Sequence, residues 1–145
     1  MSAPGMHWTA SLLLAACAAL PVNAEVPMAF RGYWVPQAQR CDAQLGLVVK
    51  SDRLVLKNGT ETRSFQDIVV CHSCVGGSKS DGIEIWLIPE FGTARPSPFI
   101  VRLNADRVLG EAKLDIKEDG LKQQFPLDAV PIKRCENRIP ASRLP

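Results

Sequence analysis

The sequence contains little of what enzymes commonly use for catalysis. Only two of its 145 residues are histidines, His7 and His72, and His7 lies in a segment that we expect to be removed. His72 lies between two cysteines, so a disulfide there would leave it poorly placed to act as a general base. No Gly-x-Ser-x-Gly elbow, Gly-x-Gly-x-x-Gly fingerprint or phosphate loop is present. We therefore expect no catalytic residues and no cofactor, a pattern that favours a binding module over an enzyme.

The sequence also lacks a long apolar run and an excess of charge of one sign. Its longest apolar run, Trp8–Leu20, has 13 residues, which is too few to cross a bilayer. The 17 Lys and Arg residues are interspersed with 15 Asp and Glu residues, which gives a net charge of +2. This balance argues against nucleic acid as a partner. With 46% hydrophobic and 22% charged residues, the composition is that of one globular domain.

Residues 1–24 contain no Lys, Arg, Asp or Glu, whereas the remainder of the chain is evenly charged. An uncharged apolar segment of this length is typical of a signal peptide, and Val22-Asn23-Ala24 resembles the end of a cleavage site. We expect cleavage before Glu25 and export to the periplasm or the exterior. In one alternative, Leu14-Ala15-Ala16-Cys17 is a bacterial lipobox, and Cys17 then anchors the protein to a membrane. In the other, the segment is a short N-terminal core helix.

Five cysteines are present, and four of them lie beyond the expected leader: Cys41, Cys71, Cys74 and Cys135. An even number of cysteines in an exported chain indicates disulfides, and four cysteines allow three pairings. We favour Cys71–Cys74 with Cys41–Cys135, because two intervening residues keep Cys71 within reach of Cys74. The Cys41–Cys135 bridge would then close a span of 94 residues, which chain-entropy reasoning values at about 4–5 kcal/mol. In the alternative pairings, Cys41 bonds to Cys71 or Cys74, and Cys135 bonds to the other.

Beyond residue 25 the apolar residues alternate along short runs, and no helical stripe appears. Alternation interrupted by Gly, Pro and Asp turns is typical of short antiparallel strands. The pattern predicts about eight strands, drawn from residues 30–34, 45–49, 54–56, 60–63, 65–70, 83–88, 99–103, 114–117, 121–125 and 130–134. Asn58-Gly59 predicts a type I′ hairpin turn, in which both residues have positive φ. We expect one all-β domain over residues 25–135, a small antiparallel barrel or sandwich stapled by disulfides, and a loose tail over 136–145.

Gly32-Tyr33-Trp34 opens the expected domain. A Gly-x-Trp segment on the first strand resembles the opening of lipocalin-type and avidin-type barrels, although the later Thr-Asp-Tyr and Arg motifs of lipocalins are absent. The resemblance implies that Gly32 permits close backbone packing and that Trp34 plugs one end of a barrel. The layout is also similar to small exported bacterial β-domain proteins with an aromatic-x-Gly-x-Trp opening, a class that implies a fold and a compartment but no activity. In the plainer interpretation, Trp34 is a core residue beside Phe30.

Cys71-His72-Ser73-Cys74 is the most chemically suggestive segment. Its spacing is that of a redox dithiol, and thiol–disulfide exchange through Cys71 and Cys74 is the alternative function. A β-like run precedes it and Val75-Gly76-Gly77 follows it, so no helix dipole is expected to stabilise a thiolate. Two thiolates and one imidazole are too few for a zinc site unless the other two cysteines are reduced and complete it. We therefore expect a structural disulfide and no metal.

The candidate binding surfaces are the mouth of the expected barrel and an aromatic patch beside a glycine-rich loop. If alternate residues of the run 83–88 fill the core, Trp86 is partly outside, and Phe91 follows in a Pro-rich loop. An exposed aromatic patch often marks a binding surface. With Gly76 and Gly77 of the glycine-rich loop, these residues form the predicted contact for a protein, a glycan or a small apolar ligand. In the alternative, Trp86 is buried beneath residues 89–98.

Overall fold

The computed structural model describes residues 25–76 and 82–136. The expected leader, the expected tail apart from its first residue, and Gly77 lie outside the described residues. Within the described part, the elements other than strands are two short 3₁₀ helices, η1 (Met28–Phe30) and η3 (Ala105–Arg107), and one α-helix, α1 (Asp119–Gln124).

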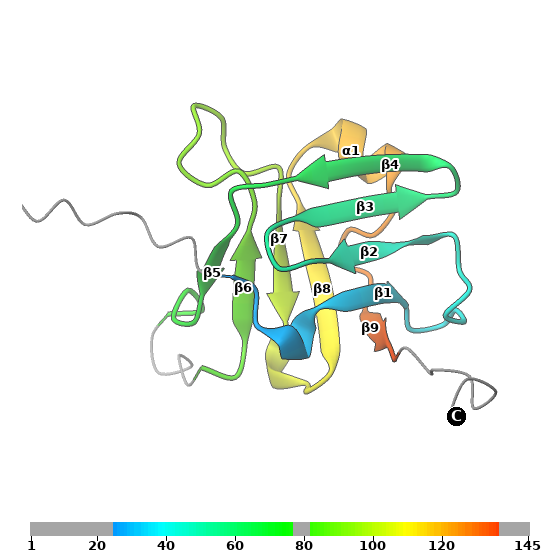
Figure 1. Cartoon of the computed structure of the whole chain (residues 1–145), viewed down its shortest axis with the longest axis horizontal. Helices are drawn as coiled ribbons and strands as arrows, with labels where there is room; N and C mark the ends of the chain where they lie inside the picture. The colour runs from blue at the N-terminus through cyan, green and yellow to red at the C-terminus, as the bar shows by residue number, and fades with distance from the viewer. Residues whose placement is uncertain (1–24, 77–81, 137–145) are drawn as a thin grey trace, which may run out of the picture.

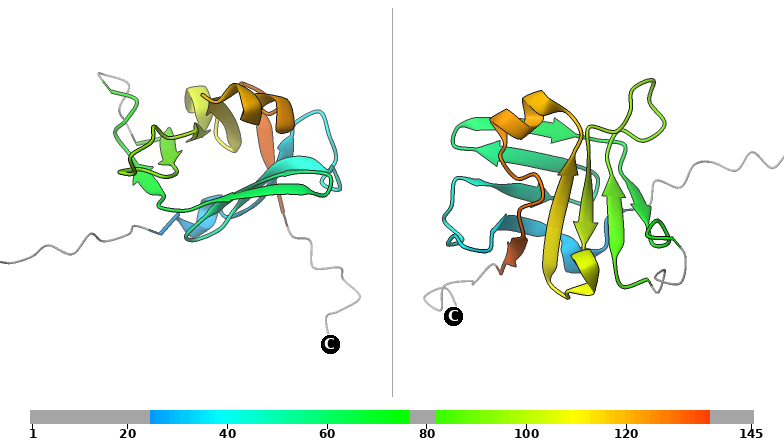
Figure 2. Two further views of the ribbon diagram at one scale, coloured as in Figure 1. Left: turned by 90° about the horizontal axis from the view of Figure 1, so that it is seen from above. Right: turned by 180° about the vertical axis from the view of Figure 1, so that it is seen from behind.

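In the described residues, nine antiparallel strands form a single sheet. The strands are β1 (Gly32–Pro36), β2 (Leu45–Val49), β3 (Leu54–Asn58), β4 (Glu61–Phe65), β5 (Val69–Cys71), β6 (Ile85–Ile88), β7 (Phe99–Leu103), β8 (Glu111–Ile116) and β9 (Ile132–Cys135). Their order is β4-β3-β2-β1-β9-β8-β7-β6-β5, so every neighbouring pair except β1–β9 is consecutive along the chain. The sheet curls into a half-barrel in which β1–β4 face β5–β8 (Figure 1 and Figure 2). The all-β, antiparallel prediction is confirmed.

The core follows the period-two alternation of the sequence. Strand β7 buries Phe99, Val101 and Leu103. Strand β8 buries Ala112, Leu114 and Ile116. The rings of Phe65 and Phe99 lie 4.9 Å apart at 88°, so an edge-to-face contact joins β4 to β7 across the interior. Because these strands lie in opposite halves of the curled sheet, this contact holds the two halves together.

The prediction of a strand over residues 121–125 is wrong. These residues belong largely to α1, and the amide of Phe125 donates a hydrogen bond of 2.8 Å to the carbonyl of Leu121. Leu121 and Phe125 are both fully buried, because residues four apart share one face of a helix. The same two positions also share one face of a strand, so their apolar character did not distinguish the two structures.

The hairpin at Asn58-Gly59 forms, but with a different turn. Asn58 is the Cα partner of Glu61, so Gly59 and Thr60 make the two-residue loop. Only Gly59 has positive φ, at 63°, and the predicted type I′ conformation with Asn58 in the turn is wrong. Asn58 instead donates a hydrogen bond of 2.9 Å from its side-chain amide to the carbonyl of Gln124, which ties the hairpin to the end of α1.

The residues expected to form one strand over 65–70 are divided between two strands and a link. Phe65 ends β4, and the next strand, β5, begins only at Val69. The residues between them carry the chain from one edge of the sheet to the other. Ile68 is buried in this link, which explains why its apolar side chain extends the strand-like pattern.

Trp34 is a core residue, 2% exposed, and its indole N–H donates a hydrogen bond of 2.9 Å to the carbonyl of Phe30. The neighbouring strand β2 carries Gly46 where it passes Trp34 closely. A Cβ at Gly46 would lie 2.4 Å from the Trp34 carbonyl oxygen and 2.6 Å from the ring of Tyr33. Only glycine therefore fits at position 46 without displacing the backbone of β1.

Two disulfides form with the favoured pairing, Cys41–Cys135 and Cys71–Cys74. The first links the β1–β2 loop to the end of β9, across a sequence separation of 94. The second closes the short segment that follows the edge strand β5. The long bridge therefore constrains nearly the whole domain, whereas the short one shapes a single corner.

Candidate functional site: a strained loop fixed by a buried carboxylate

Polar side chains gather on the outer face of strands β6, β7 and β8. Trp86 lies opposite Arg102, and Arg102 lies opposite Lys113, so the three form one row across the strands. The backbone partner of Trp86 on its other side is Cys71, at the start of the short disulfide. Because successive residues of a strand point to opposite faces, this row turns away from the core.

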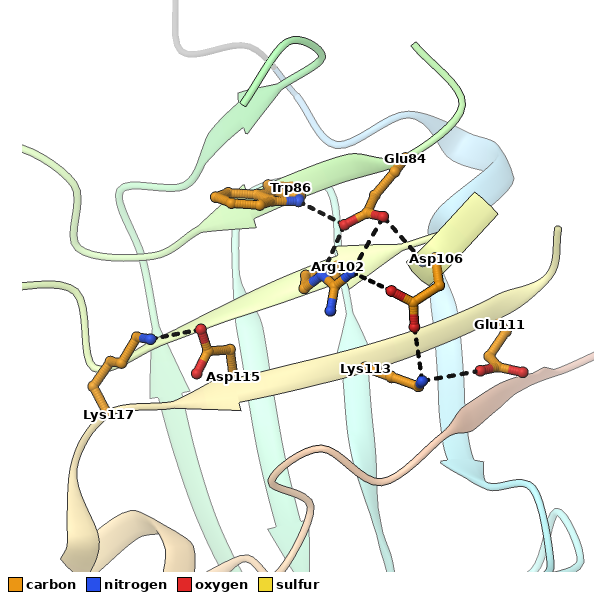
Figure 3. A network of polar contacts seen from close by, with 8 residues as sticks. All are labelled: Glu84, Trp86, Arg102, Asp106, Glu111, Lys113, Asp115 and Lys117. Atoms are coloured by element: carbon orange, nitrogen blue, oxygen red, sulfur yellow. Dashed lines mark hydrogen bonds and ion pairs between the residues drawn. The ribbon is translucent and has the colours of Figure 1, made fainter. Parts of the chain in front are cut away.

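Glu84 is the centre of this face. It comes one residue before β6, and its side chain is only 5% exposed, which makes it the one buried charged residue in the described part of the chain. Its carboxylate accepts hydrogen bonds from Arg102 Nε at 2.7 Å and Arg102 Nη2 at 3.3 Å. It also accepts from the indole N–H of Trp86 at 2.9 Å and from the backbone N–H of Asp106 at 2.9 Å (Figure 3). Each carboxylate oxygen thus has two donors, which offsets the desolvation of the charge.

The network continues outward through Asp106. Its carboxylate accepts from Arg102 Nη2 at 2.7 Å and from Lys113 Nζ at 2.9 Å. Lys113 also lies 3.8 Å from Glu111 (Figure 3). Acids and bases therefore alternate from Glu84 through Arg102, Asp106 and Lys113 to Glu111, and each carboxylate of this network has a cation beside it.

These contacts keep the network ionised. Burial opposes ionisation of Glu84, but the hydrogen bonds from Arg102, Trp86 and the Asp106 amide outweigh it and lower the pKa of the carboxyl. The hydrogen bonds from Lys113 and Arg102 lower the pKa of Asp106 to about 2. The same contacts raise the pKa of Arg102, chiefly through Glu84, and that of Lys113, chiefly through Asp106. At neutral pH these carboxylates hold no proton to donate, and their oxygens are engaged with donors.

The network fixes the β7–β8 loop (residues 104–110) in a strained conformation. Asn104, Asp106 and Arg107 have φ of 52°, 53° and 66°, in the left-handed region. A non-glycine residue there is uncommon, and each one costs of order 1 kcal/mol or more unless its surroundings enforce it. The hydrogen bond from the Asp106 amide to Glu84 is one contact that holds the backbone in this conformation.

Asn104 provides a second constraint on the loop. Its side-chain amide donates 2.9 Å to the carbonyl of Ile83, and its side-chain oxygen accepts 3.0 Å from the amide of Gly110. One side chain therefore closes the loop on itself and attaches it to the residue before Glu84. Ala105 is fully buried beneath it.

The tip of this loop is apolar and exposed. Val108 is 49% exposed and Leu109 is 76% exposed, although aliphatic side chains of this size are usually inside. Beside the loop, a pocket of about 290 Å³ is lined by Val75, Glu84, Arg102, Asp106 and Arg107. Val75 follows Cys74 directly, so the disulfide corner forms one wall of this pocket.

The four residues predicted from sequence as a binding surface do not all come together. Trp86 is half-buried and donates to Glu84, so it belongs to the network. Phe91 is 58% exposed on the 89–98 loop, and its amide donates to the carbonyl of Asp67. Among the described residues the aromatic ring pair is Phe65 with Phe99, so Trp86 and Phe91 do not stack. Gly76 is exposed beside the pocket wall, and Gly77 lies outside the described residues.

Sequence reasoning missed Glu84, Arg102 and Asp106. In the alternating run, Glu84 shares the outer face with Trp86, which gives no sign of its burial. A weak signal was present in the loop, because Asn and Asp tolerate the left-handed conformation better than other non-glycine residues do. Asn104 and Asp106 occupy two of the strained positions.

The disulfide corner follows strand β5. Residues 72–75, described directly after Cys71, form bends and turns and include no helix. His72 is exposed in this corner. Over residues 25–76 and 82–136, no group of three or more His, Cys, Asp or Glu side chains is arranged to hold a metal ion.

No helix in the part of the chain that the structure describes has the length and apolar character needed to cross a membrane. Comparison with protein-family models, curated proteins and solved structures finds no match to this chain.

Proposed function

We propose that this chain is an exported, non-enzymatic binding module, of the kind that inhibits or recruits another protein, and that it contacts its partner through the β7–β8 loop. The observation that carries the proposal is the combination of a strained, doubly tethered backbone with two exposed aliphatic side chains at its tip. Two disulfides are compatible with an oxidising compartment.

A rigid loop is well suited to binding. Ordering a flexible loop on association consumes part of the interaction free energy, and a loop already fixed in its bound shape avoids this loss. Glu84 and Asn104 hold this loop before any partner arrives. Val108 and Leu109 then serve as apolar anchors, since a few buried side chains supply most of the binding energy of an interface.

The same features favour a protein over the other two partner classes. A small apolar ligand would need a largely apolar cavity, but Leu121, Phe125 and Leu127 are fully buried within the core, and four of the five residues that line the pocket beside the loop are charged. A glycan site commonly offers an aromatic face, whereas the exposed anchors of this loop are aliphatic. An apolar pocket on a folded protein is the natural complement of Val108 and Leu109.

The test compares anchor variants with a matched control. Purified protein carrying Val108→Ser and Leu109→Ser is immobilised beside the wild type and a Phe91→Ala variant, and proteins captured from the host's exported fraction are quantified by mass spectrometry. We expect one partner that is retained by wild type and Phe91→Ala, with affinity for the anchor variant reduced by about tenfold or more. Equal capture by all three, or loss only with Phe91→Ala, would overturn the proposal.

A further inference from the structure

Strand β4 is one end of the nine-stranded sheet and pairs only with β3 among the described strands. Its first four residues, Glu61, Thr62, Arg63 and Ser64, are all exposed. Seen from above, α1 lies across the concave side from β4 rather than along its free edge (Figure 2). This edge therefore presents backbone groups that are available to another strand.

The hairpin register identifies which residues present those groups. A two-residue loop makes its flanking pair, Asn58 and Glu61, a hydrogen-bonded pair. Hydrogen-bonded and non-bonded pairs then alternate, so Arg63 and Phe65 bond inward to β3. Thr62 and Ser64 direct their backbone N–H and C=O outward, to the free edge.

We propose that β4 pairs antiparallel with β4 of a second copy of this chain, about a two-fold axis at Thr62. In this register Thr62 faces Thr62 of the second copy as a hydrogen-bonded pair. Glu61 then faces Arg63 of the second copy, and the symmetry repeats the contact on the other side. Both are non-hydrogen-bonded pairs, in which the Cα atoms approach to about 4.5 Å and side chains interact most closely.

Charge selects this register and this partner. Charged side chains on an edge strand commonly prevent pairing by repulsion, but Glu61 and Arg63 carry opposite signs two residues apart, so the strand is complementary to itself. A slip by two residues would place Arg63 against Arg63. The other edge strand, β5, consists of three residues, Val69–Cys71, and none of them is charged. It therefore offers no charge pairs that would favour one register or one partner. The guanidinium of Arg63 lies 5.3 Å from the centre of the Phe65 ring, which holds it on the face it shares with Glu61.

The dimer leaves the β7–β8 loop accessible. In Figure 1, β4 lies at one end of the half-barrel and the loop between β7 and β8 lies at the other. The dimer would therefore present two such loops pointing away from its interface. The inference does not depend on the proposed function, because it uses a different edge and different residues.

Sedimentation of the purified full chain, as processed by the expressing cell, tests the proposal over a range of concentrations and salt. We expect a monomer–dimer equilibrium that weakens as salt rises. Glu61→Arg, or Arg63→Glu, should raise the dimer Kd by about tenfold or more, because both cross-strand pairs become repulsive. The double exchange Glu61→Arg with Arg63→Glu restores both pairs and should restore dimerisation.

Thr62→Pro is the second variant. It removes an outward N–H without removing a bond to β3, so the monomer should keep its melting temperature while the dimer is lost. A chain that is monomeric at every concentration overturns the proposal. A dimer that tolerates Glu61→Arg and Thr62→Pro also overturns it, because its interface then lies elsewhere.

Discussion

The backbone amide of Asp106 donates a hydrogen bond of 2.9 Å to the carboxylate of Glu84, which is separated from it by 22 residues in the sequence. This bond joins the residue before β6 to a residue with φ of 53°. A buried charge and a strained backbone are each unfavourable alone, and here each offsets the other.

Replacing Glu84 by Gln should lower the free energy of unfolding by about 2 kcal/mol, because Arg102 and the Asp106 amide lose a charged acceptor. The measurement is equilibrium unfolding in urea, with hydrogen exchange of the Asp106 amide as a local readout. Asp115→Asn is the matched control, since Asp115 pairs with the exposed Lys117 and should change stability by less than about 1 kcal/mol. Similar losses in both variants would show that Glu84 has no special role.

Stability should fall in acid through Glu84 and Asp106. Their pKa values in the folded chain are lowered, that of Asp106 to about 2, whereas in the unfolded chain they are about 4.3 and 3.9. The unfolded state therefore binds more protons, so the contribution is complete above about pH 5 and is lost as pH falls toward about 2. Unfolding measured from pH 7 to pH 2 should show this loss, and a smaller one in Glu84→Gln. Parallel curves for the two proteins would contradict the prediction.

The two disulfides should differ in their effect on stability. Replacing Cys41 and Cys135 with Ala removes a closure of 94 residues and should lower the free energy of unfolding by about 4–5 kcal/mol. Replacing Cys71 and Cys74 removes a closure between residues three apart, worth about 1–2 kcal/mol by the same reasoning. Denaturant unfolding of the two double variants checks the order. The reverse order would mean that the short bridge stabilises through local packing.

The reduction potential of the Cys71–Cys74 bridge separates a binding module from a thiol–disulfide exchange protein. With turns rather than a helix after Cys71, we expect a structural bridge with a potential below about −300 mV. Redox titration with peptide mapping measures it. A value of about −200 to −120 mV would instead support redox chemistry at these two cysteines.

Gly46→Ala should destabilise the domain by about 2 kcal/mol, because the added Cβ meets the backbone of Trp34. Gly120→Ala is a control that should stabilise the domain instead. Nothing lies within 4 Å of a Cβ at Gly120, which is inside α1, where Ala is favoured over Gly by about 0.5–1 kcal/mol. Thermal unfolding of both variants gives the comparison, and a neutral Gly46→Ala would place the close approach in doubt.

Particular residues explain which predictions succeeded. The alternation of Phe99, Val101 and Leu103 predicted β7, because a strand with one buried face needs an apolar residue at every second position. The spacing of Cys71 and Cys74 indicated their pairing, because two cysteines with two residues between them can come within bonding distance whatever the rest of the fold is. Leu121 and Phe125 led to the wrong prediction of a strand, because residues four apart share one face of a helix and also one face of a strand.

By itself, the sequence indicated the all-β class, most of the strands and a preferred pairing of the cysteines, because these follow largely from local periodicity and from the short spacing of Cys71 and Cys74. Only the tertiary structure decided that Glu84 is buried, that three non-glycine residues of the β7–β8 loop adopt positive φ, and that Val108 and Leu109 are left exposed. The physical reason is that burial and strain depend on which strands become neighbours. Arg102 and Asp106 reach Glu84 across 18 and 22 residues, a distance over which local patterns carry no information.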